Sequence, residues 1–398
     1  MGNAVMTRSL FILALGFLGV SCFDVQYSWR QVEFDFPDQK TKEEWKHTGR
    51  LQPNNTLLLD VDRTGKDPKD RVFATTPSFG PGVPATLSTV ITNDNGRVFL
   101  RPFPSWEENN RDDCSGLTSV MRVKTTKCAH LWVLDSGRMD IMGEFTQKCP
   151  PKLRVYDLKS DKIFWEYQIP EETLVDDSLL GTVEVVGNCT HPFAYLADIV
   201  GHGIIVVDTV KKQSWRVQNE LTGNDDDATN FNLNGQSFTL PDGVISLTAA
   251  RNTLYFHSLA SYREHLVQTT VLNNPHYFVG SDEGYQYFHT STGKRSGQSG
   301  PAVIARDSVM FFSNLPENAL YCWRVGTPYV PENQHLVFRD DVKFQFPSGL
   351  KIVTDRYGKD WLMATTSRFQ NYMKKVVNPK EVNYRILTVD VDSLLSKC

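Results

Sequence analysis

SGLKIVTDRYGKDWLMATTSRFQ, residues 348–370, contains two short apolar segments separated by a polar turn. The segments run from Leu350 to Val353 and from Trp361 to Thr365. Asp355 and Gly358 lie between them and are typical turn residues. This composition predicts a β-hairpin.

The second strand of this hairpin has five counterparts elsewhere in the chain. Each is rich in large apolar residues and ends on Asp, Ser or Thr. The six segments are RVFAT (71–75), LWVLD (131–135), AYLAD (194–198), LYFHS (254–258), VMFFS (309–313) and WLMAT (361–365). Subtracting successive starts gives spacings of 60, 63, 60, 55 and 52 residues. A repeat of this length made of strands, without helical segments between copies, indicates a propeller rather than a solenoid.

Six repeats of about four strands close into one round domain. We therefore predict that the 398-residue chain is all-β and forms a single six-bladed propeller over residues 23–398. The last repeat has strands near Leu350, Trp361 and Tyr384, after which the chain stops. The segment YSWRQVEFDF, from Tyr27, is predicted to supply the fourth strand and close the ring, which removes an exposed edge.

The first 22 residues have the pattern of a secretory signal peptide. Arg8 precedes an apolar run from Leu10 to Val20, and small residues follow up to Cys22. The run is too short to span a membrane. We expect cleavage near Cys22 and a soluble, secreted mature chain.

Seven cysteines are present, and removal of Cys22 with the signal peptide leaves six, which in a secreted chain implies disulfides. Cys128 and Cys189 each lie just before the second strand of adjacent hairpins, so we expect both at the same rim. The repeat positions predict three pairs: Cys114 with Cys149, Cys128 with Cys189, and Cys322 with Cys398. None of the spacings is typical of a zinc site.

The formal net charge is −4, and it becomes −5 when the signal peptide removes Arg8. Such a chain has no basic footprint for nucleic acid. Asn54 and Asn188 each begin an N-glycosylation sequon. Asp225 to Asp227 form an acidic run that we interpret as a solvated loop, with calcium binding as the alternative.

Catalytic motifs are scarce. The chain has no GxSxG, HExxH or phosphate-binding glycine loop after a strand. Glu184 and Asp242 are the only inner-strand carboxylates suited to a metal-dependent propeller hydrolase, fewer than a divalent ion requires. His202 follows Asp198 by four residues and is interpreted as a turn histidine, with pairing to Asp198 as the alternative. We predict no catalytic residue, metal or cofactor.

Small-molecule sites of propellers tend to lie at one mouth of the central channel, where loops join the blades. The residues at the ends of the second strands are short and polar, and they offer hydrogen bonds without a strong nucleophile. They are Thr75-Thr76-Pro77, Asp135-Ser136-Gly137-Arg138, Asp198-Ile199-Val200, Ser258-Leu259-Ala260, Ser313-Asn314-Leu315 and Thr365-Thr366-Ser367.

Several motifs resemble the yellow and major royal jelly protein family, and within it the yellow-related proteins of sand fly saliva. The resemblance covers nearly the whole mature chain. The motifs are CSGLTSVMRV from Cys114, CAHLWVLDSG from Cys128, QKCPPKLRVYDL from Gln147, NCTHPFAYLAD from Asn188 and FPSGLKIVTD from Phe346. The resemblance implies a six-bladed propeller secreted in the saliva of a blood feeder. It also implies sequestration of serotonin, catecholamines and histamine in a channel pocket, without turnover.

The resemblance also implies a ligand site beside the last hairpin. Ser348 occupies the position of a threonine in the salivary binders and keeps its hydroxyl. Their asparagine corresponds to Thr366 or Ser367, and their aromatic residue corresponds to Phe369. Ser348 and Thr366 are expected to hydrogen-bond the ligand, and Phe369 to form an aromatic wall.

Two other functions stay open. Some yellow relatives are linked to dopachrome conversion, which requires an acid and a base, and Asp135 or Asp198 is the available carboxylate at the mouth. The chain is alternatively a secreted protein with no small-molecule ligand. We expect a monomer that binds neither nucleic acid nor membrane.

Overall fold

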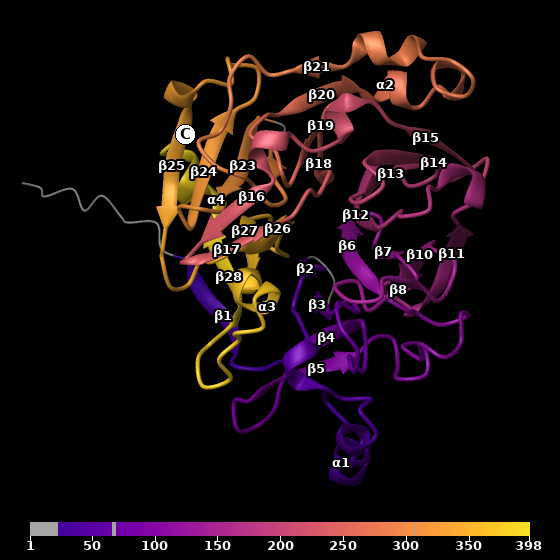
Figure 1. Ribbon diagram of the computed structural model, residues 1–398, viewed down its shortest axis with the longest axis vertical. Helices are drawn as coiled ribbons and strands as arrows, with labels where there is room; N and C mark the ends of the chain where they lie inside the picture. Colours follow the sequence, from indigo (N-terminus) through magenta and orange to yellow (C-terminus); the bar gives the residue numbers. More distant parts are fainter. Residues whose placement is uncertain (1–22, 66–68, 307) are drawn as a thin grey trace, which may run out of the picture.

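The computed structural model describes residues 23–65, 69–306 and 308–398. Six antiparallel sheets of four strands each stand around a common axis as the blades of a β-propeller (Figure 1). The predicted fold class is therefore confirmed. The expected signal peptide, residues 1–22, lies outside the described residues.

Blades 1 to 5 each use four strands of their own repeat, in sequence order from the axis outward. Blade 1 contains β2 (Asp60–Arg63), β3 (Val72–Thr75), β4 (Leu87–Thr92) and β5 (Val98–Pro102), and blade 2 contains β6 (Val120–Thr126), β7 (His130–Asp135), β10 (Lys152–Asp157) and β11 (Lys162–Gln168). Blade 3 contains β12 (Leu180–Gly187), β13 (Pro192–Asp198), β14 (Gly203–Asp208) and β15 (Gln213–Val217), and blade 4 contains β18 (Val244–Ala250), β19 (Thr253–Ser258), β20 (His265–Gln268) and β21 (His289–Thr290). Blade 5 contains β22 (Val303–Ala305), β23 (Val309–Asn314), β24 (Ala319–Arg324) and β25 (Gln334–Arg339).

Blade 6 combines both ends of the chain. It contains β26 (Pro347–Thr354), β27 (Asp360–Thr366), β28 (Tyr384–Asp390) and, as its outermost strand, β1 (Asp24–Trp29). The expected strand from Tyr27 thus begins three residues earlier, at Asp24, and ends at Trp29. Beyond Trp29 the chain leaves blade 6 and follows the outer strand of blade 1, where Leu100 donates to Glu33 at 2.8 Å.

Short helices, two small hairpins and 3₁₀ turns lie outside the sheets of the blades. The α-helices are α1 (Gln39–His47), α2 (Thr269–Leu272), α3 (Phe369–Met373) and α4 (Val391–Leu395), and two small hairpins are formed by β8 (Arg138–Met139) with β9 (Thr146–Gln147) and by β16 (Asn230–Leu233) with β17 (Gln236–Thr239). Single 3₁₀ turns lie at Pro53–Asn55, Glu171–Thr173, Glu220–Thr222, Asp226–Ala228, Pro275–Tyr277, Glu283–Tyr287 and Pro331–Asn333. None of the helices in the described ranges is long and apolar enough to cross a bilayer.

A buried apolar run precedes the first inner strand. The apolar run from Thr56 to Leu59 is buried, but the β2 ladder begins at Asp60. Backbone oxygens of this run are used across the seam between blades, because the Tyr384 hydroxyl donates to Thr56 at 2.9 Å. High burial alone therefore does not distinguish this segment from a strand.

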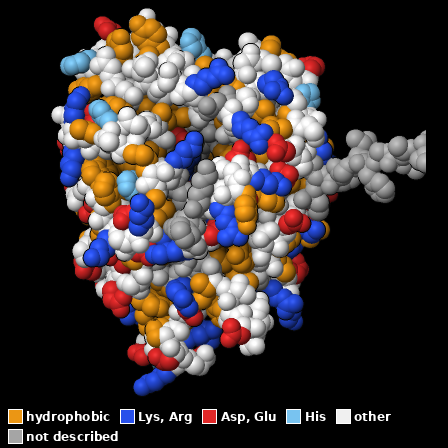
Figure 2. Space-filling view, turned by 180° about the vertical axis from the view of Figure 1, so that it is seen from behind, with side chains coloured by type: hydrophobic (Ala, Val, Ile, Leu, Met, Phe, Trp, Pro, Cys, Tyr) orange, Lys and Arg blue, Asp and Glu red, His pale blue; other side chains and the backbone are white. Residues whose placement is uncertain are grey.

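Apolar side chains fill the spaces between neighbouring blades. Leu134 of blade 2 and Leu196 of blade 3 belong to one buried cluster, and Phe311 of blade 5 and Leu362 of blade 6 belong to another. Burial on both faces explains why the second strands are almost continuously apolar. The outer surface carries acidic and basic side chains interspersed with each other, as seen on the face in Figure 2.

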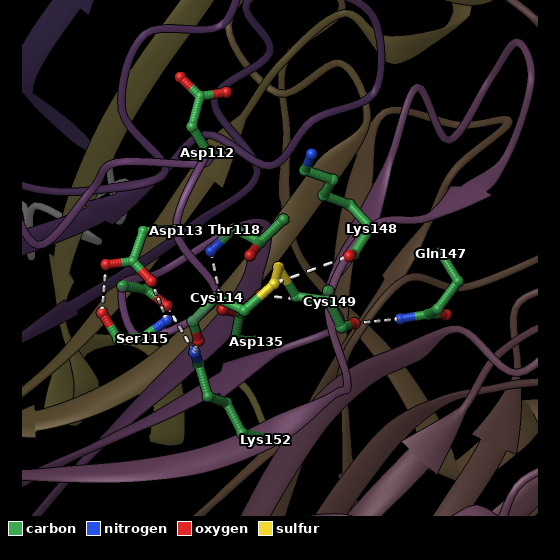
Figure 3. Close-up of a disulfide and its surroundings, with 12 residues drawn as sticks. Asp112, Asp113, Cys114, Ser115, Thr118, Asp135, Gln147, Lys148, Cys149 and Lys152 are labelled. Carbon is green, nitrogen blue, oxygen red and sulfur yellow. Dashed lines mark hydrogen bonds between the residues drawn. A yellow bond between two sulfur atoms is a disulfide. The ribbon is translucent and has the colours of Figure 1, made fainter.

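The three predicted disulfides are present. Cys128 joins Cys189 between the hairpin turns of blades 2 and 3, and Cys322 joins Cys398 and ties the C-terminus to blade 5. The pair Cys114 and Cys149 lies at the opposite rim, next to the end of β7 (Figure 3). Disulfides of this kind form and persist in oxidising compartments.

Candidate functional site

A cavity of about 550 Å³ lies on the propeller axis, where the inner strands begin. Every blade contributes to its lining. The lining residues are Leu59, Phe79, Met121, Arg122, Ile141, Met142, Phe145, Asp177, Leu179, Ile199, Val200, His202, Leu240, Pro241, Asp242, Ile245, Leu259, Gly300, Pro301, Phe346, Ser348 and Phe369. We call it the central cavity. Its size and its largely apolar lining are typical of small-molecule sites.

Three phenylalanines form an aromatic wall on one side of the central cavity. Phe369 begins α3, and its ring centroid lies 4.7 Å from that of Phe346 and 6.0 Å from that of Phe79. Phe238 of the β16–β17 hairpin also reaches this wall, with a centroid distance of 6.4 Å to Phe369. The wall therefore joins blade 1, blade 6 and the hairpin that precedes blade 4.

Asp242, two residues before β18, and Asp177 are the carboxyl-bearing residues that line the central cavity. The side chain of Asp242 is half-buried and lines the central cavity. In the described part of the chain no group donates a hydrogen bond to this carboxyl. Burial raises the pKa of Asp242 to about 7, and the charge of Arg122 offsets only part of that effect.

Arg122 of β6 supplies a buried cation to the same cavity. Its two terminal nitrogens donate to the backbone oxygens of Gly181, at 3.2 Å, and Ser348, at 3.1 Å. Its Nε has no hydrogen-bond partner within the described residues. Burial lowers the pKa of Arg122, and Asp60 and Asp242 counteract that shift. The backbone contacts hold the guanidinium at the cavity without neutralising it.

The mouth of the central cavity is more polar. Asp177 is exposed there, and His202 places a ring nitrogen 3.0 Å from the oxygen of Pro241. The alternative pairing of His202 with Asp198 is not formed, because Asp198 binds Arg216 at 2.9 Å.

Two of the four residues predicted for the ligand site line the central cavity, and two do not. Ser348 and Phe369 line the central cavity. The Ser348 hydroxyl, however, donates to Leu59 at 2.6 Å. Thr366 and Ser367 are buried and do not belong to the lining; Thr366 donates to Lys343 at 3.0 Å, and the Ser367 hydroxyl has no hydrogen-bond partner among the described residues.

The carboxylates at the ends of the second strands are bound by groups of the protein itself. Asp135 accepts from the amides of Thr118 and Ser119, both at 2.8 Å, and lies beside the disulfide in Figure 3. Asp198 accepts from the Ser178 hydroxyl at 2.6 Å in addition to its contact with Arg216. Each carboxylate thus fixes the start of its own inner strand. Neither lines the central cavity, and the apolar residue after Asp198, Ile199, lines it instead.

The other carboxylate singled out from the sequence has a partner. Glu184 lies 2.8 Å from Lys124 and does not line the central cavity. Across the described ranges, no group of three or more His, Cys, Asp or Glu side chains is placed to hold a metal ion.

Sequence reasoning missed most of the cavity lining. Asp242 was identified only as a metal ligand candidate, and Arg122, Phe79 and Phe346 were not assigned to the site. A usable signal exists for Arg122, since it is a charged residue that interrupts the buried apolar strand VMRV, on the same strand face as Lys124. No local signal identifies the phenylalanines, which come from separate blades.

Comparison with known proteins places these features in a family. The family model described as "Major royal jelly protein" matches residues 118–398. The curated relatives include "Dopaminechrome tautomerase" of Drosophila melanogaster, 29% identical over 94% of this chain and 83% of the relative. They also include "Protein yellow" of Drosophila subobscura, 31% identical over 99% of this chain and 71% of the relative, and of Drosophila guanche, 32% identical over the same shares.

Proposed function

Because this chain belongs to the yellow and major royal jelly protein family, we propose that its central cavity binds small aromatic amines and releases them unchanged. The Asp242 carboxyl carries this proposal, because it lines a largely apolar cavity and accepts no hydrogen bond from any of the described residues. A ligand ammonium supplies the missing donor and favours the ionised carboxylate.

The aromatic wall provides the second contact. An indole or catechol ring is flat and apolar, and Phe346 and Phe369 offer ring surface on one side of the cavity. Arg122 provides the third contact, since its guanidinium is a donor for a ligand hydroxyl. Catecholamines and serotonin carry both an ammonium and a hydroxyl, so they satisfy Asp242 and Arg122 together. Histamine carries an ammonium but no hydroxyl.

The proposed setting is extracellular. Three disulfides support passage through an oxidising compartment. The proposed role is removal of host serotonin, catecholamines and histamine by saliva at a bite, and this role rests on the resemblance described above.

Isothermal calorimetry of the secreted protein against dopamine, serotonin and histamine tests the proposal. We expect one site per chain, with histamine the weakest ligand. Asp242→Asn should remove most of the affinity, whereas Asp177→Asn, at the mouth, should change it little. Absence of binding at micromolar concentrations of all three amines would contradict the proposal and favour a secreted protein without a small-molecule ligand.

A second candidate function is tautomerisation of an aminochrome. A tautomerase moves a proton within its substrate, which requires a base near neutral pKa and a cation that stabilises negative charge on oxygen. Asp242, with a pKa of about 7, fits the base, and Arg122 fits the cation. The relative named dopaminechrome tautomerase favours this candidate.

Turnover separates the two candidates. Dopaminechrome incubated with a small molar fraction of protein should lose its visible absorbance faster than the buffer control only if the protein is a tautomerase, and Asp242→Asn should abolish that excess rate. Binding of amines with no excess rate supports the first proposal alone.

A further inference from the structure

A second concave surface lies at the seam between blades 6 and 1, and it shares no lining residue with the central cavity. It is a groove of about 670 Å³ lined by residues 25–34, Phe36, Lys42 and Lys46 of α1, Leu51, Pro53, residues 96–98 and Pro379. We call it the seam groove. Its floor is the segment that leaves β1 and crosses to blade 1.

The seam groove combines aromatic surface with polar groups that lack ionic partners. Tyr27 and Phe36 are half-buried in its lining. In the described ranges, neither Arg30 nor Lys42 forms an ion pair with a carboxylate. A hexopyranose requires both features, because its C–H face packs on aromatic rings while its hydroxyls need hydrogen-bonding partners.

Asn54 stands at the edge of this groove. It is exposed, and the lining residue Gln31 donates from Nε2 to Asn54 Oδ1 at 2.7 Å. Its neighbour Pro53 is itself part of the lining. Asn54 Nδ2, the atom that carries an N-linked glycan, makes no hydrogen bond within the described residues, and Asn54-Asn55-Thr56 is a sequon.

We propose that an N-linked glycan on Asn54 occupies the seam groove and holds the N-terminal segment across the seam between blades 6 and 1. In the secretory pathway a lipid-linked oligosaccharide pyrophosphate is the donor. The bond from sugar C1 to the pyrophosphate oxygen breaks, a bond from C1 to Asn54 Nδ2 forms, and Nδ2 loses one proton. The proposal shares only secretion with the proposed function and is independent of amine binding.

Asn188 provides the internal control. It lies in the exposed turn after β12, and its Oδ1 accepts from the Thr190 amide at 2.9 Å and the His191 amide at 2.8 Å. It belongs to a sequon of the same kind but is not part of the seam groove. A glycan there should change neither the groove nor the N-terminal segment.

The test uses the full chain secreted from insect cells, with the glycans mapped by mass spectrometry. Hydrogen exchange of residues 24–36 is compared between wild type, Asn54→Gln and Asn188→Gln. We expect Asn54→Gln to speed exchange in this segment about 3- to 10-fold, and Asn188→Gln to leave it unchanged. Amine affinity should be the same in all three, so failure here is distinguishable from failure of the proposed function.

Lys42→Ala sharpens the test, because the Lys42 ammonium forms no ion pair in the described structure. It should speed exchange of residues 24–36 in the glycosylated chain and have no further effect in the Asn54→Gln background. An unmodified Asn54 in the secreted wild type overturns the proposal. Equal exchange in wild type and Asn54→Gln also overturns it, and would mean that the glycan extends into solvent.

Discussion

Buried charges on the inner strands fall into two regions. Between blades 6 and 1 and between blades 2 and 3, lysines are paired with carboxylates: Lys351 lies 3.0 Å from Asp60, and Lys124 lies 2.8 Å from Glu184. In the central cavity, at the start of the inner strand of blade 4, Asp242 has no donor among the described residues. The ion pairs of the first region join neighbouring blades. In the second region, the Asp242 carboxyl has neither an ion pair nor a hydrogen-bond donor among the described residues.

The difference shows how a structural charge is distinguished from a functional one. Burial alone would lower the pKa of Lys124, but Glu184, together with the charges of Asp62 and Asp60, raises it. At Asp242 burial prevails over Arg122, and the pKa rises. A carboxyl left in that state within an apolar cavity is a candidate binding or catalytic group.

Removing the N-terminal segment that completes blade 6 should have the largest effect on stability. Deletion of residues 23–36 removes β1 and the buried side chains of Trp29 and Phe34, and it exposes the edge of β28. We expect loss of secretion, or a melting temperature far below that of wild type. Unchanged melting of the truncated chain would show that β1 is not needed to close the ring.

Breaking the paired region should reduce stability and spare binding. Lys351→Met leaves Asp60 buried without its cation and should lower the free energy of unfolding by about 3–5 kcal/mol. Amine affinity should change less than about twofold. The exposed pair of Lys359 with Asp390 is the control, since Lys359→Met should cost at most about 1 kcal/mol. Equal losses for the two variants in urea denaturation would contradict the role given to burial.

Asp242→Asn should have the opposite effect on stability. The pKa of Asp242 is about 7 in the folded protein and lies near 3.8 when the chain is unfolded, so ionisation favours unfolding as pH rises. The variant should be more stable than wild type by an amount that grows from about pH 4 to pH 7, with an upper limit of about 4 kcal/mol. Parallel denaturation curves at pH 4, 6 and 8 measure this gap; a gap that shrinks with pH would show the sign to be wrong.

The same variant should weaken amine binding by about 10- to 150-fold at pH 8. Wild-type affinity should fall about tenfold per pH unit below pH 7, because the carboxyl becomes protonated, whereas the affinity of Asp242→Asn should be flat. Calorimetry of both proteins from pH 5.5 to 8 provides the comparison. Parallel pH profiles would assign the dependence to another group.

The smallest effects are expected beside the last hairpin. Phe369→Leu keeps a buried apolar side chain but removes aromatic surface from the cavity, so amine affinity should fall about 2- to 5-fold. Thr366→Val removes the hydrogen bond to Lys343 and should cost about 1 kcal/mol of stability without changing affinity. A larger binding loss for Thr366→Val than for Phe369→Leu would restore Thr366 to the ligand site.

The repeat made the fold predictable from the sequence. The strand ends at Thr75, Asp135, Asp198, Ser258 and Thr365 were placed within a residue of their observed positions. The same regularity placed two cysteine pairs at the rims and left Cys322 with Cys398 as the third, and all three disulfides are present. The site was only partly predictable: Ser348 and Phe369 reach the central cavity, and Thr366 and Ser367 do not.

The sequence alone determined the number of blades, the ends of the second strands and the cysteine pairs, because these depend on apolar periodicity and on turn residues that recur along the chain. The tertiary structure alone decided which charges are paired and which face the cavity. Asp198 and Asp242 look alike as polar residues beside apolar strands, yet one meets Arg216 and the Ser178 hydroxyl while the other meets an apolar cavity. The physical reason is that pairing and desolvation depend on side chains contributed by other blades, whose approach is set only when the ring has formed.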